Sequence, residues 1–359
     1  PNFRPRITVI VPTYNDAQTI NEKLFNLIEQ SYPTNLMEIL MIDSASKDQT
    51  VDIVRRFMSD YPEVNMKFIV EEERRGKSAA INRALSNIDS QSEIVIMTDA
   101  NAFLNKHAVQ KVIARFSFPE VGAVVGRQMV HSTNQSSEAR SERAYLSFYQ
   151  KMRRGESSID STPIFDGELS AYRTRVIKGV RIRENLNADD SQLAIIVRRQ
   201  GYKAVIEPEA IFYESLPSHR RALRIQKVRR GQGLARLFWY NKVVMFRRSY
   251  GKFGSTIFPA NFFMHVISPF FVLGSILLAG VSILSLVLQT GTLFIPLILL
   301  SIVLITILGE QIVPTRTKVS NIALTFLEYQ LILLEGIVRY LIGDSLHKWQ
   351  KVQKTPNPA

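Results

Sequence analysis

The sequence contains no cysteine, which excludes disulfide bridges, thiolate catalysis and metal centres with cysteine ligands. The five histidines are scattered, and their spacing is not that of metal ligands. The glycine motifs that bind phosphate in dinucleotide-dependent dehydrogenases and P-loop NTPases, G-x-G-x-x-G and G-x-x-x-x-G-K-S/T, are missing as well. These absences remove the main sequence support for both enzyme classes.

Negative charge is missing from a long part of the chain. No acidic residue occurs between Glu214 and Glu310. Residues 215–359 carry 17 Lys/Arg against 4 Asp/Glu, whereas residues 1–214 carry 28 of each. The formal net charge of +13 therefore comes from the C-terminal part alone.

Two long apolar runs lie in this part, Phe262–Leu288 and Thr292–Val313. About 20 apolar residues cross a bilayer core, so both runs are long enough to span it. A third segment, Ser320–Gly343, carries its polar residues in one helical stripe. We expect it to lie in the membrane interface, with a third span as the alternative. No apolar segment precedes the first predicted strand, so we expect no signal or anchor there.

Eleven Lys/Arg residues lie between Arg220 and Lys252, directly before the first predicted span. By the positive-inside rule this side of the membrane is cytoplasmic, which predicts a multi-pass cell-membrane protein with a cytoplasmic N-terminal domain. Anionic lipid headgroups account for these cations as well as nucleic acid would, and their position beside a span favours lipid. We therefore expect membrane lipids as partners and no nucleic acid.

Residues 1–125 alternate short β-branched runs with helical patterns. This alternation predicts an α/β fold with a mainly parallel sheet and flanking helices, in which ligands bind at the carboxyl ends of the strands. The expected strands are Ile7–Val11, Glu38–Ile42, Lys67–Val70, Glu93–Met97 and Gly122–Val125, and the expected helices are Ala17–Gln30, Asp48–Ser59, Ser78–Ile88 and Lys106–Phe116.

Polar motifs follow four of these strands and supply carboxylates, cations and an aromatic ring. Together they suit a crevice for a base, a ribose and a metal-bound diphosphate. The motifs are Pro12-Thr13-Tyr14-Asn15-Asp16, Asp43-Ser44-Ala45-Ser46-Lys47-Asp48, Arg74-Arg75-Gly76-Lys77 and Asp99-Ala100-Asn101.

The segments VIVPTYND, MIDSASKDQT, RRGKSAAIN and IVIMTDAN, in this order and at this spacing, resemble the nucleotide-binding half of family 2 glycosyltransferases with the GT-A fold. The resemblance extends over about residues 7–240. The apolar helices behind it are similar to those of the membrane-integrated, polysaccharide-synthase-like branch. This resemblance implies a Rossmann-like sheet, a nucleotide-sugar donor and a divalent cation.

On the donor side, the resemblance implies that Tyr14, Asp16 and Asp43 hold the nucleoside, with Pro12 in the same motif as Tyr14. Lys77 would lie near the diphosphate or the sugar.

Asp99 and Asn101 occupy the place of the family's D-x-D motif and would hold Mn²⁺ or Mg²⁺ through oxygen ligands. The asparagine removes one negative charge from this motif. The alternative is that Asp99 only caps the helix that follows.

On the acceptor side, Gly167 lies in a small-residue turn, Phe165-Asp166-Gly167-Glu168, and Tyr172 follows it. Asp189 and Asp190 match the family's acidic motif, and Asp190 would be the general base that activates the acceptor hydroxyl. Two aspartates also favour the N-terminus of a helix, and both roles are compatible.

The segment from Gln226 to Arg230 resembles the Q-x-x-R-W motif of processive synthases, with Arg230 in the place of tryptophan. Gln226 would lie on the acceptor side, and Arg229 would offset charge on the departing diphosphate. The alternative for these cations is contact with lipid, which we favour for Lys227 and Arg230.

These inferences divide the chain into a cytosolic GT-A domain (1–230), a basic interfacial helix region (231–258), transmembrane and interfacial helices (259–345) and a basic tail (346–359). The predicted activity is inverting transfer of a sugar, from a nucleotide-sugar donor that we expect to be UDP-linked, to a hydroxyl of a lipid-linked or saccharide acceptor. Two alternatives stay open. One is a processive polysaccharide synthase, and the other is a catalytically silent nucleotide-sugar-binding subunit of a membrane complex.

Overall fold

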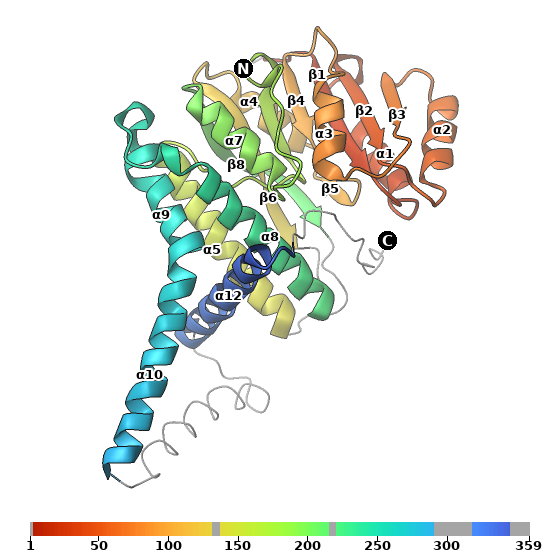
Figure 1. Cartoon of the computed structure of the whole chain (residues 1–359). Helices are drawn as coiled ribbons and strands as arrows, with labels where there is room; N and C mark the ends of the chain where they lie inside the picture. The colour runs from red at the N-terminus through yellow and green to blue at the C-terminus, as the bar shows by residue number, and fades with distance from the viewer. Residues whose placement is uncertain (1–2, 131–136, 215–219, 291–317, 345–359) are drawn as a thin grey trace.

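The computed structural model describes residues 3–130, 137–214, 220–290 and 318–344, and its centre is one eight-stranded sheet (Figure 1). The strand order is β3-β2-β1-β4-β7-β6-β8-β5. The strands are β1 (Ile7–Thr13), β2 (Met37–Asp43), β3 (Met66–Val70), β4 (Ile94–Met97), β5 (Ala102–Leu104), β6 (Val121–Val130), β7 (Ser170–Arg173) and β8 (Lys203–Glu214).

The five predicted strands are confirmed as β1, β2, β3, β4 and β6, but the sheet is mixed rather than mainly parallel. Strands β1 to β4 are parallel, whereas β7 is antiparallel to both of its neighbours, β4 and β6. Strand β8 is parallel to β6, and β5 is antiparallel to β8. The sequence patterns missed β5, β7 and β8, which include the antiparallel members.

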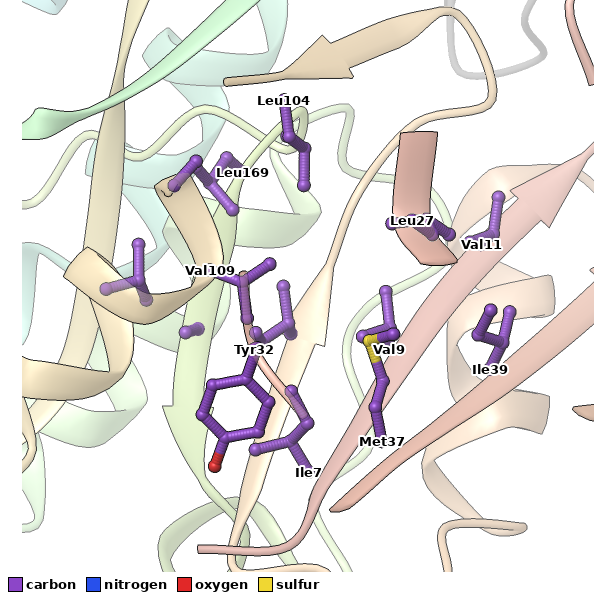
Figure 2. Close-up of a cluster of buried hydrophobic side chains, with 14 of the residues drawn as sticks. Ile7, Val9, Val11, Leu27, Tyr32, Met37, Ile39, Leu104, Val109 and Leu169 are labelled. Carbon is purple, nitrogen blue, oxygen red and sulfur yellow. The ribbon is translucent and has the colours of Figure 1, made fainter. Parts of the chain in front are cut away.

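Alternate residues along each strand point to opposite faces of the sheet, and both sets are apolar. Helices therefore cover both faces. One face carries α1, α2 and α4, and its apolar cluster includes Val9 and Ile39 (Figure 2). The other face carries α3, α6 and α7 over Ile10 and Leu40. These helices are α1 (Ile20–Ile28), α2 (Thr50–Asp60), α3 (Lys77–Leu85), α4 (Ala108–Arg115), α6 (Thr174–Ile177) and α7 (Asp189–Arg199).

A third apolar cluster lies beyond the sheet, between α5 (Ser137–Ile159), α8 (Arg220–Tyr240) and the helices that follow. Among its fully buried side chains are Phe238 of α8, Phe258 of α9 (Phe258–Phe262) and Leu333 of α12 (Lys318–Leu341). This cluster joins the C-terminal helices to the rest of the molecule.

One continuous helical segment, Phe253–Gln289, is long and apolar enough to cross a bilayer, and an 18-residue stretch of it has a mean hydropathy of 2.5. It includes α9 and α10 (Ser268–Thr290), and α10 projects away from the sheet (Figure 1). The first predicted span lies within this segment. The second, Thr292–Val313, and the basic tail lie outside the described residues.

Helix α12, which contains most of the third predicted segment, packs along α8 (Figure 1). The Nε2 atom of Gln232 in α8 donates to the carbonyl oxygens of Gly336 (3.2 Å) and Asp344 (3.0 Å). Glu335 accepts from Arg224 of α8 at 2.7 Å and forms an i,i+4 pair with Arg339. The polar stripe therefore contacts another helix of the protein.

A close backbone contact holds α8 against the start of α7. A Cβ added at Gly233 would lie 2.8 Å from the carbonyl oxygen of Asn187. We expect Gly233→Ala to lower the free energy of unfolding by about 1–3 kcal/mol, because backbone atoms cannot move aside as a side chain can. Thermal unfolding in detergent measures the effect.

Gly155→Ala in α5 is the matched control, because a Cβ at this exposed position meets no described atom within 4 Å. This control should keep or raise the stability, by up to about 1 kcal/mol, through its better helix propensity. Equal stability of the two variants would contradict a tight contact at Gly233.

Candidate active site

A cavity of about 410 Å³ opens at the carboxyl ends of β1 and β4, between the sheet and α8. All but two of the predicted site residues line it, although they come from segments far apart in the sequence. They are Pro12, Tyr14, Asp16, Lys77, Asp99, Asn101, Gly167, Asp189, Asp190, Gln226 and Arg229.

Asp43, which the resemblance assigned to the nucleoside, does not line the cavity. Its side chain is fully buried, and Oδ1 accepts from the backbone N–H of Ser46 at 2.8 Å. Oδ2 accepts from the hydroxyls of Thr13, at 3.2 Å, and Ser46. The carboxylate therefore orders the loops behind the cavity wall, where Thr13 and Ser44 face the space instead.

Tyr172, which we assigned to the acceptor side, is also buried away from the cavity. It lies on β7 with no exposed surface, and its hydroxyl donates to the backbone carbonyl of Asp190 at 2.9 Å. Tyr172 therefore positions the first turn of α7 and does not face an acceptor directly.

At one end of the cavity, a stacked pair forms the wall. The guanidinium of Arg74 lies 4.0 Å from the centre of the Tyr14 ring. Asp16 closes the turn after β1, because its Oδ2 accepts from the backbone N–H of Tyr14 at 3.0 Å. Arg74 belongs to the motif that follows β3, but no sequence pattern indicates that it stacks on Tyr14. A flat polarisable wall of this kind suits a planar base.

A buried lysine holds the turn that carries Asp99. Lys23 of α1 is fully buried, and its Nζ donates to the hydroxyl of Thr98 at 2.7 Å and to the carbonyl of Ala102. Thr98 in turn donates to the carbonyl of Glu168 at 2.7 Å. Burial lowers the pKa of Lys23 to about 7, although Asp99 acts in the opposite direction. This chain of bonds fixes the turn after β4 against the turn that contains Glu168.

Lys77, at the start of α3, forms an ion pair with Asp99 across the cavity floor (Nζ–Oδ1, 2.6 Å). Burial opposes its charge, but Asp99, Glu168 and Asp189 outweigh burial and raise the pKa of Lys77. A Cβ at Gly167 would lie only 3.0 Å from the Lys77 ammonium, so the glycine leaves room for it. The lysine is therefore a fixed positive charge in the middle of the cavity.

Asp189 and Asp190 form the first turn of α7. Asp189 is buried and accepts from the hydroxyl of Ser78, while Asp190 accepts from the backbone N–H of Ser191 at 2.8 Å. Burial raises the pKa of Asp190 to about 7; Lys77 opposes the rise and the nearby Asp166 carboxylate adds to it. A carboxylate with a pKa near neutrality has the property that general-base chemistry requires.

Arg229 reaches the cavity from α8, one turn after Gln226. Burial lowers the pKa of its guanidinium, although Asp189 and Asp99 act to raise it. Its Nε is buried and has no hydrogen-bond partner among the described residues. The arginine therefore adds positive charge on the side of the cavity where Asp99 lies.

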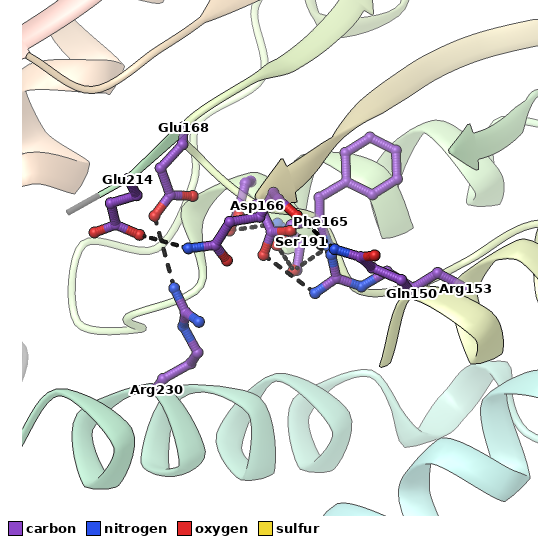
Figure 3. A network of polar contacts seen from close by, with 10 residues as sticks. Gln150, Arg153, Phe165, Asp166, Glu168, Ser191, Glu214 and Arg230 are labelled. Carbon is purple, nitrogen blue, oxygen red and sulfur yellow. Dashed lines mark hydrogen bonds and ion pairs between the residues drawn. The ribbon is translucent and has the colours of Figure 1, made fainter. Parts of the chain in front are cut away.

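The opposite wall is a network of charged side chains (Figure 3). Arg153 of α5 binds both carboxylate oxygens of Asp166, and both side chains are nearly buried. Arg230, which we expected to contact lipid, lines the cavity instead and lies 3.6 Å from Glu168. Asp166 and Glu168 flank Gly167 in the small-residue turn, whereas no sequence signal marked Arg153.

Asp99 and Asn101 both line the cavity and offer a carboxylate and an amide oxygen. Within the described ranges, no group of three or more His, Asp or Glu side chains could hold a metal alone. Mg²⁺ and Mn²⁺ are commonly held by one or two protein oxygens together with phosphate oxygens and water. These residues therefore fit a divalent ion that arrives with a diphosphate.

Comparison with known proteins defines the class of this site. Residues 8–181 match the family described as Glycosyl transferase family 2. This segment, just under half of the chain, is similar to enzymes of that family, and the sheet with its flanking helices is of the GT-A-like mixed type. A solved mannosyltransferase, PcManGT from Pyrobaculum calidifontis in complex with GDP-Man and Mn²⁺, is 29% identical with a TM-score of 0.77. The match covers 95% of this chain and 88% of that one.

Curated relatives include poly-beta-1,6-N-acetyl-D-glucosamine synthase from Staphylococcus epidermidis, 24% identical over 239 residues, or 65% of this chain and 56% of the relative. The probable glycosyltransferase YdaM from Bacillus subtilis (strain 168) is 26% identical over 236 residues, 64% of this chain and 55% of the relative. The chain thus spans little more than half the length of these relatives. The similarity to the first agrees with the polysaccharide-synthase-like branch.

The Arg153–Asp166 pair should contribute strongly to folding, because removing one partner leaves a buried charge uncompensated. We expect Arg153→Met to lower the free energy of unfolding by about 3–5 kcal/mol. The double variant Arg153→Met/Asp166→Leu should recover most of this loss, since it removes both charges. Chemical unfolding followed by tryptophan fluorescence measures both.

Lys111→Ala is the matched control, because it breaks the exposed pair between Lys111 and Glu209 and should change stability little. A double variant that is no more stable than Arg153→Met would contradict the assignment to uncompensated charge.

Proposed function

We propose that this protein transfers a sugar from a nucleotide-sugar donor to a hydroxyl group and inverts the anomeric configuration. The observation that carries the proposal is the convergence in one cavity of a diphosphate-binding end, with Lys77, Asp99 and Asn101, and a carboxylate with a pKa of about 7, Asp190. A metal-bound diphosphate and a general base are the two requirements of this reaction.

The donor belongs to the nucleoside diphosphate sugars. From the sequence we expected a UDP-linked donor, whereas a mannosyltransferase whose match covers 95% of this chain was solved with GDP-Man and Mn²⁺. GDP-linked sugars are therefore the first to test, beside UDP-linked ones. The Tyr14–Arg74 wall would stack on the base, and either base has the flat face that this requires.

Asp99 and Asn101 would hold the divalent ion, which neutralises charge on the diphosphate when it is bound. Lys77 and Arg229 would bind the phosphate oxygens and stabilise the charge that grows as the sugar departs. Lys77 already lies 2.6 Å from Asp99, so it reaches the place where that diphosphate would be.

Asp190 would take the proton of the acceptor hydroxyl. The oxygen then forms a bond to the anomeric carbon from the face opposite the diphosphate, while the carbon–oxygen bond to phosphate breaks and its electron pair leaves with the phosphate. Tyr172 and the helix start hold the Asp190 backbone, which keeps the carboxylate in one orientation.

We further propose that the protein is anchored in the cell membrane, with its catalytic domain on the cytoplasmic face. The Phe253–Gln289 helix and the eleven basic residues that precede it support this arrangement. A second span over 292–313, the division into the four regions given above and a lipid-linked acceptor remain part of this proposal. Anchoring would hold such an acceptor beside the cavity.

The test uses the purified full chain in detergent with a panel of GDP- and UDP-linked sugars, with Mn²⁺, Mg²⁺ or a chelator. We expect one donor to release its nucleoside diphosphate only when the metal is present. Donor binding without any release, in the presence of acceptors, would instead support the catalytically silent subunit.

Replacing the proposed base isolates its role. Asp190→Asn should lower the transfer rate by about 10²–10⁴-fold, because the amide cannot accept the proton, while donor affinity stays nearly unchanged. Asp52→Asn, on the exposed surface of α2, is the control and should behave like the wild type. A variant at Asp190 that transfers sugar at the normal rate would refute the assignment.

The pH profile gives a second check on Asp190. Because its pKa is raised to about 7, the carboxyl group is protonated below that pH and cannot act as a base. We expect kcat/KM to rise about tenfold per pH unit below pH 7 and to level off above it. Initial rates between pH 5.5 and 9 at saturating metal measure the profile, and a rate that falls as the pH rises through 7 would contradict this role.

A further inference from the structure

Apart from Asp190, the cavity contains a buried hydrogen-bond acceptor, the side-chain oxygen of Gln128, that has no partner among the described residues. Gln128 of β6 lines the cavity and is only 5% exposed. Its Nε2 donates to Glu214 at 3.0 Å, but its Oε1 is buried and has no hydrogen-bond partner among the described residues. A buried polar atom without a partner costs free energy, so its retention beside a cavity points to a ligand that donates a hydrogen bond there.

Two carboxylates lie beside this amide. Glu214 ends β8, Glu168 follows the turn at Gly167, and both are buried and line the cavity. Burial raises the pKa of Glu168 well above its usual range, and the nearby Glu214 adds to the shift. We name this group of three side chains, Gln128, Glu168 and Glu214, the acceptor pocket.

The positive charges near the acceptor pocket are already engaged with carboxylates (Figure 3). Arg153 binds Asp166 through two contacts, and Arg230 lies 3.6 Å from Glu168. The acceptor pocket therefore carries no excess of positive charge that would recognise a phosphate dianion. Its oxygens are instead arranged to accept hydrogen bonds from neutral donors.

Hydroxyl groups of a sugar are such donors. A ring with several adjacent hydroxyls can donate to an amide oxygen and to carboxyl oxygens at once, whether or not each carboxyl group is ionised. A lipid phosphate acceptor would bring negative charge to a wall whose arginines, Arg153 and Arg230, already contact Asp166 and Glu168.

We propose that the acceptor pocket binds a saccharide, whose hydroxyls donate to Gln128, Glu214 and Glu168, so that the enzyme extends a sugar and does not glycosylate a bare lipid phosphate. The inference rests on the proposed function. The reacting hydroxyl of the bound sugar gives its proton to Asp190 and its oxygen to the anomeric carbon, and the nucleoside diphosphate departs with the electron pair.

The test compares two kinds of acceptor with the donor found in the release assay. One set consists of octyl glycosides of glucose, mannose, galactose and N-acetylglucosamine, and the other is dodecyl phosphate. We expect transfer to at least one glycoside and none to dodecyl phosphate. Transfer to the phosphate, or to none of the glycosides, would overturn the proposal, whereas failure of every donor to release its diphosphate would count against the proposed function itself.

Variants then assign the residues. Gln128→Met should raise the KM for the glycoside about three- to tenfold, and Glu214→Gln about tenfold, with donor affinity unchanged and with kcat affected less than KM. Glu207→Gln is the matched control, because Glu207 is buried on the same strand but pairs with Arg115 away from the cavity. Thermal unfolding and donor binding verify that each variant is folded, and an unchanged acceptor KM in folded variants would overturn the assignment.

Discussion

One lysine among several buried carboxylates governs the chemistry of the cavity. Lys77 lies 2.6 Å from Asp99 and interacts with Asp189 and Glu168 as well. Its attraction does not offset the burial of Asp190, to which the nearby Asp166 carboxylate adds, so the pKa of Asp190 is raised to about 7. The same balance explains why the cavity suits a ligand that brings its own divalent cation. The proposed base and the proposed metal therefore depend on one arrangement of charges.

This arrangement depends on backbone segments that hydrogen bonds and close packing hold in place. Lys23 binds both sides of the turn that carries Asp99, and Thr98 extends the contact to the carbonyl of Glu168. The start of α7 is held by Tyr172 from β7 and by the close approach of Gly233. Side chains within such a frame keep their geometry while ligands enter and leave, which is how a pre-organised site stabilises developing charge.

Strands β1 to β4 and the polar motifs after them could be predicted from the sequence, because each strand is a local β-branched run and parallel strands bring their carboxyl ends together. The orientation of the Asp43 side chain could not be predicted from the sequence, because it depends on hydrogen bonds to Ser46 and to Thr13, which lies on a different strand. Lys23 could have been recognised as a buried residue, because it is a charged residue on the apolar side of its helix, between Ile20 and Leu24. The acceptor pocket depends on the pairing of β6 with β8, which lie about eighty residues apart and contain irregularities in register.

Helix α8 joins the apolar C-terminal helices to the part of the chain that contains the cavity. Gln226 and Arg229 reach the cavity from this helix, and Gln232, on the same helix, is bonded to α12. The apolar Phe253–Gln289 helix also packs on α8, through Phe258 against Phe238. Under the proposed anchoring, a bilayer that positions these helices would position the cavity wall as well, because α8 contacts both the apolar helix and the cavity. A lipid-linked acceptor would then be presented at a defined place relative to Asp190.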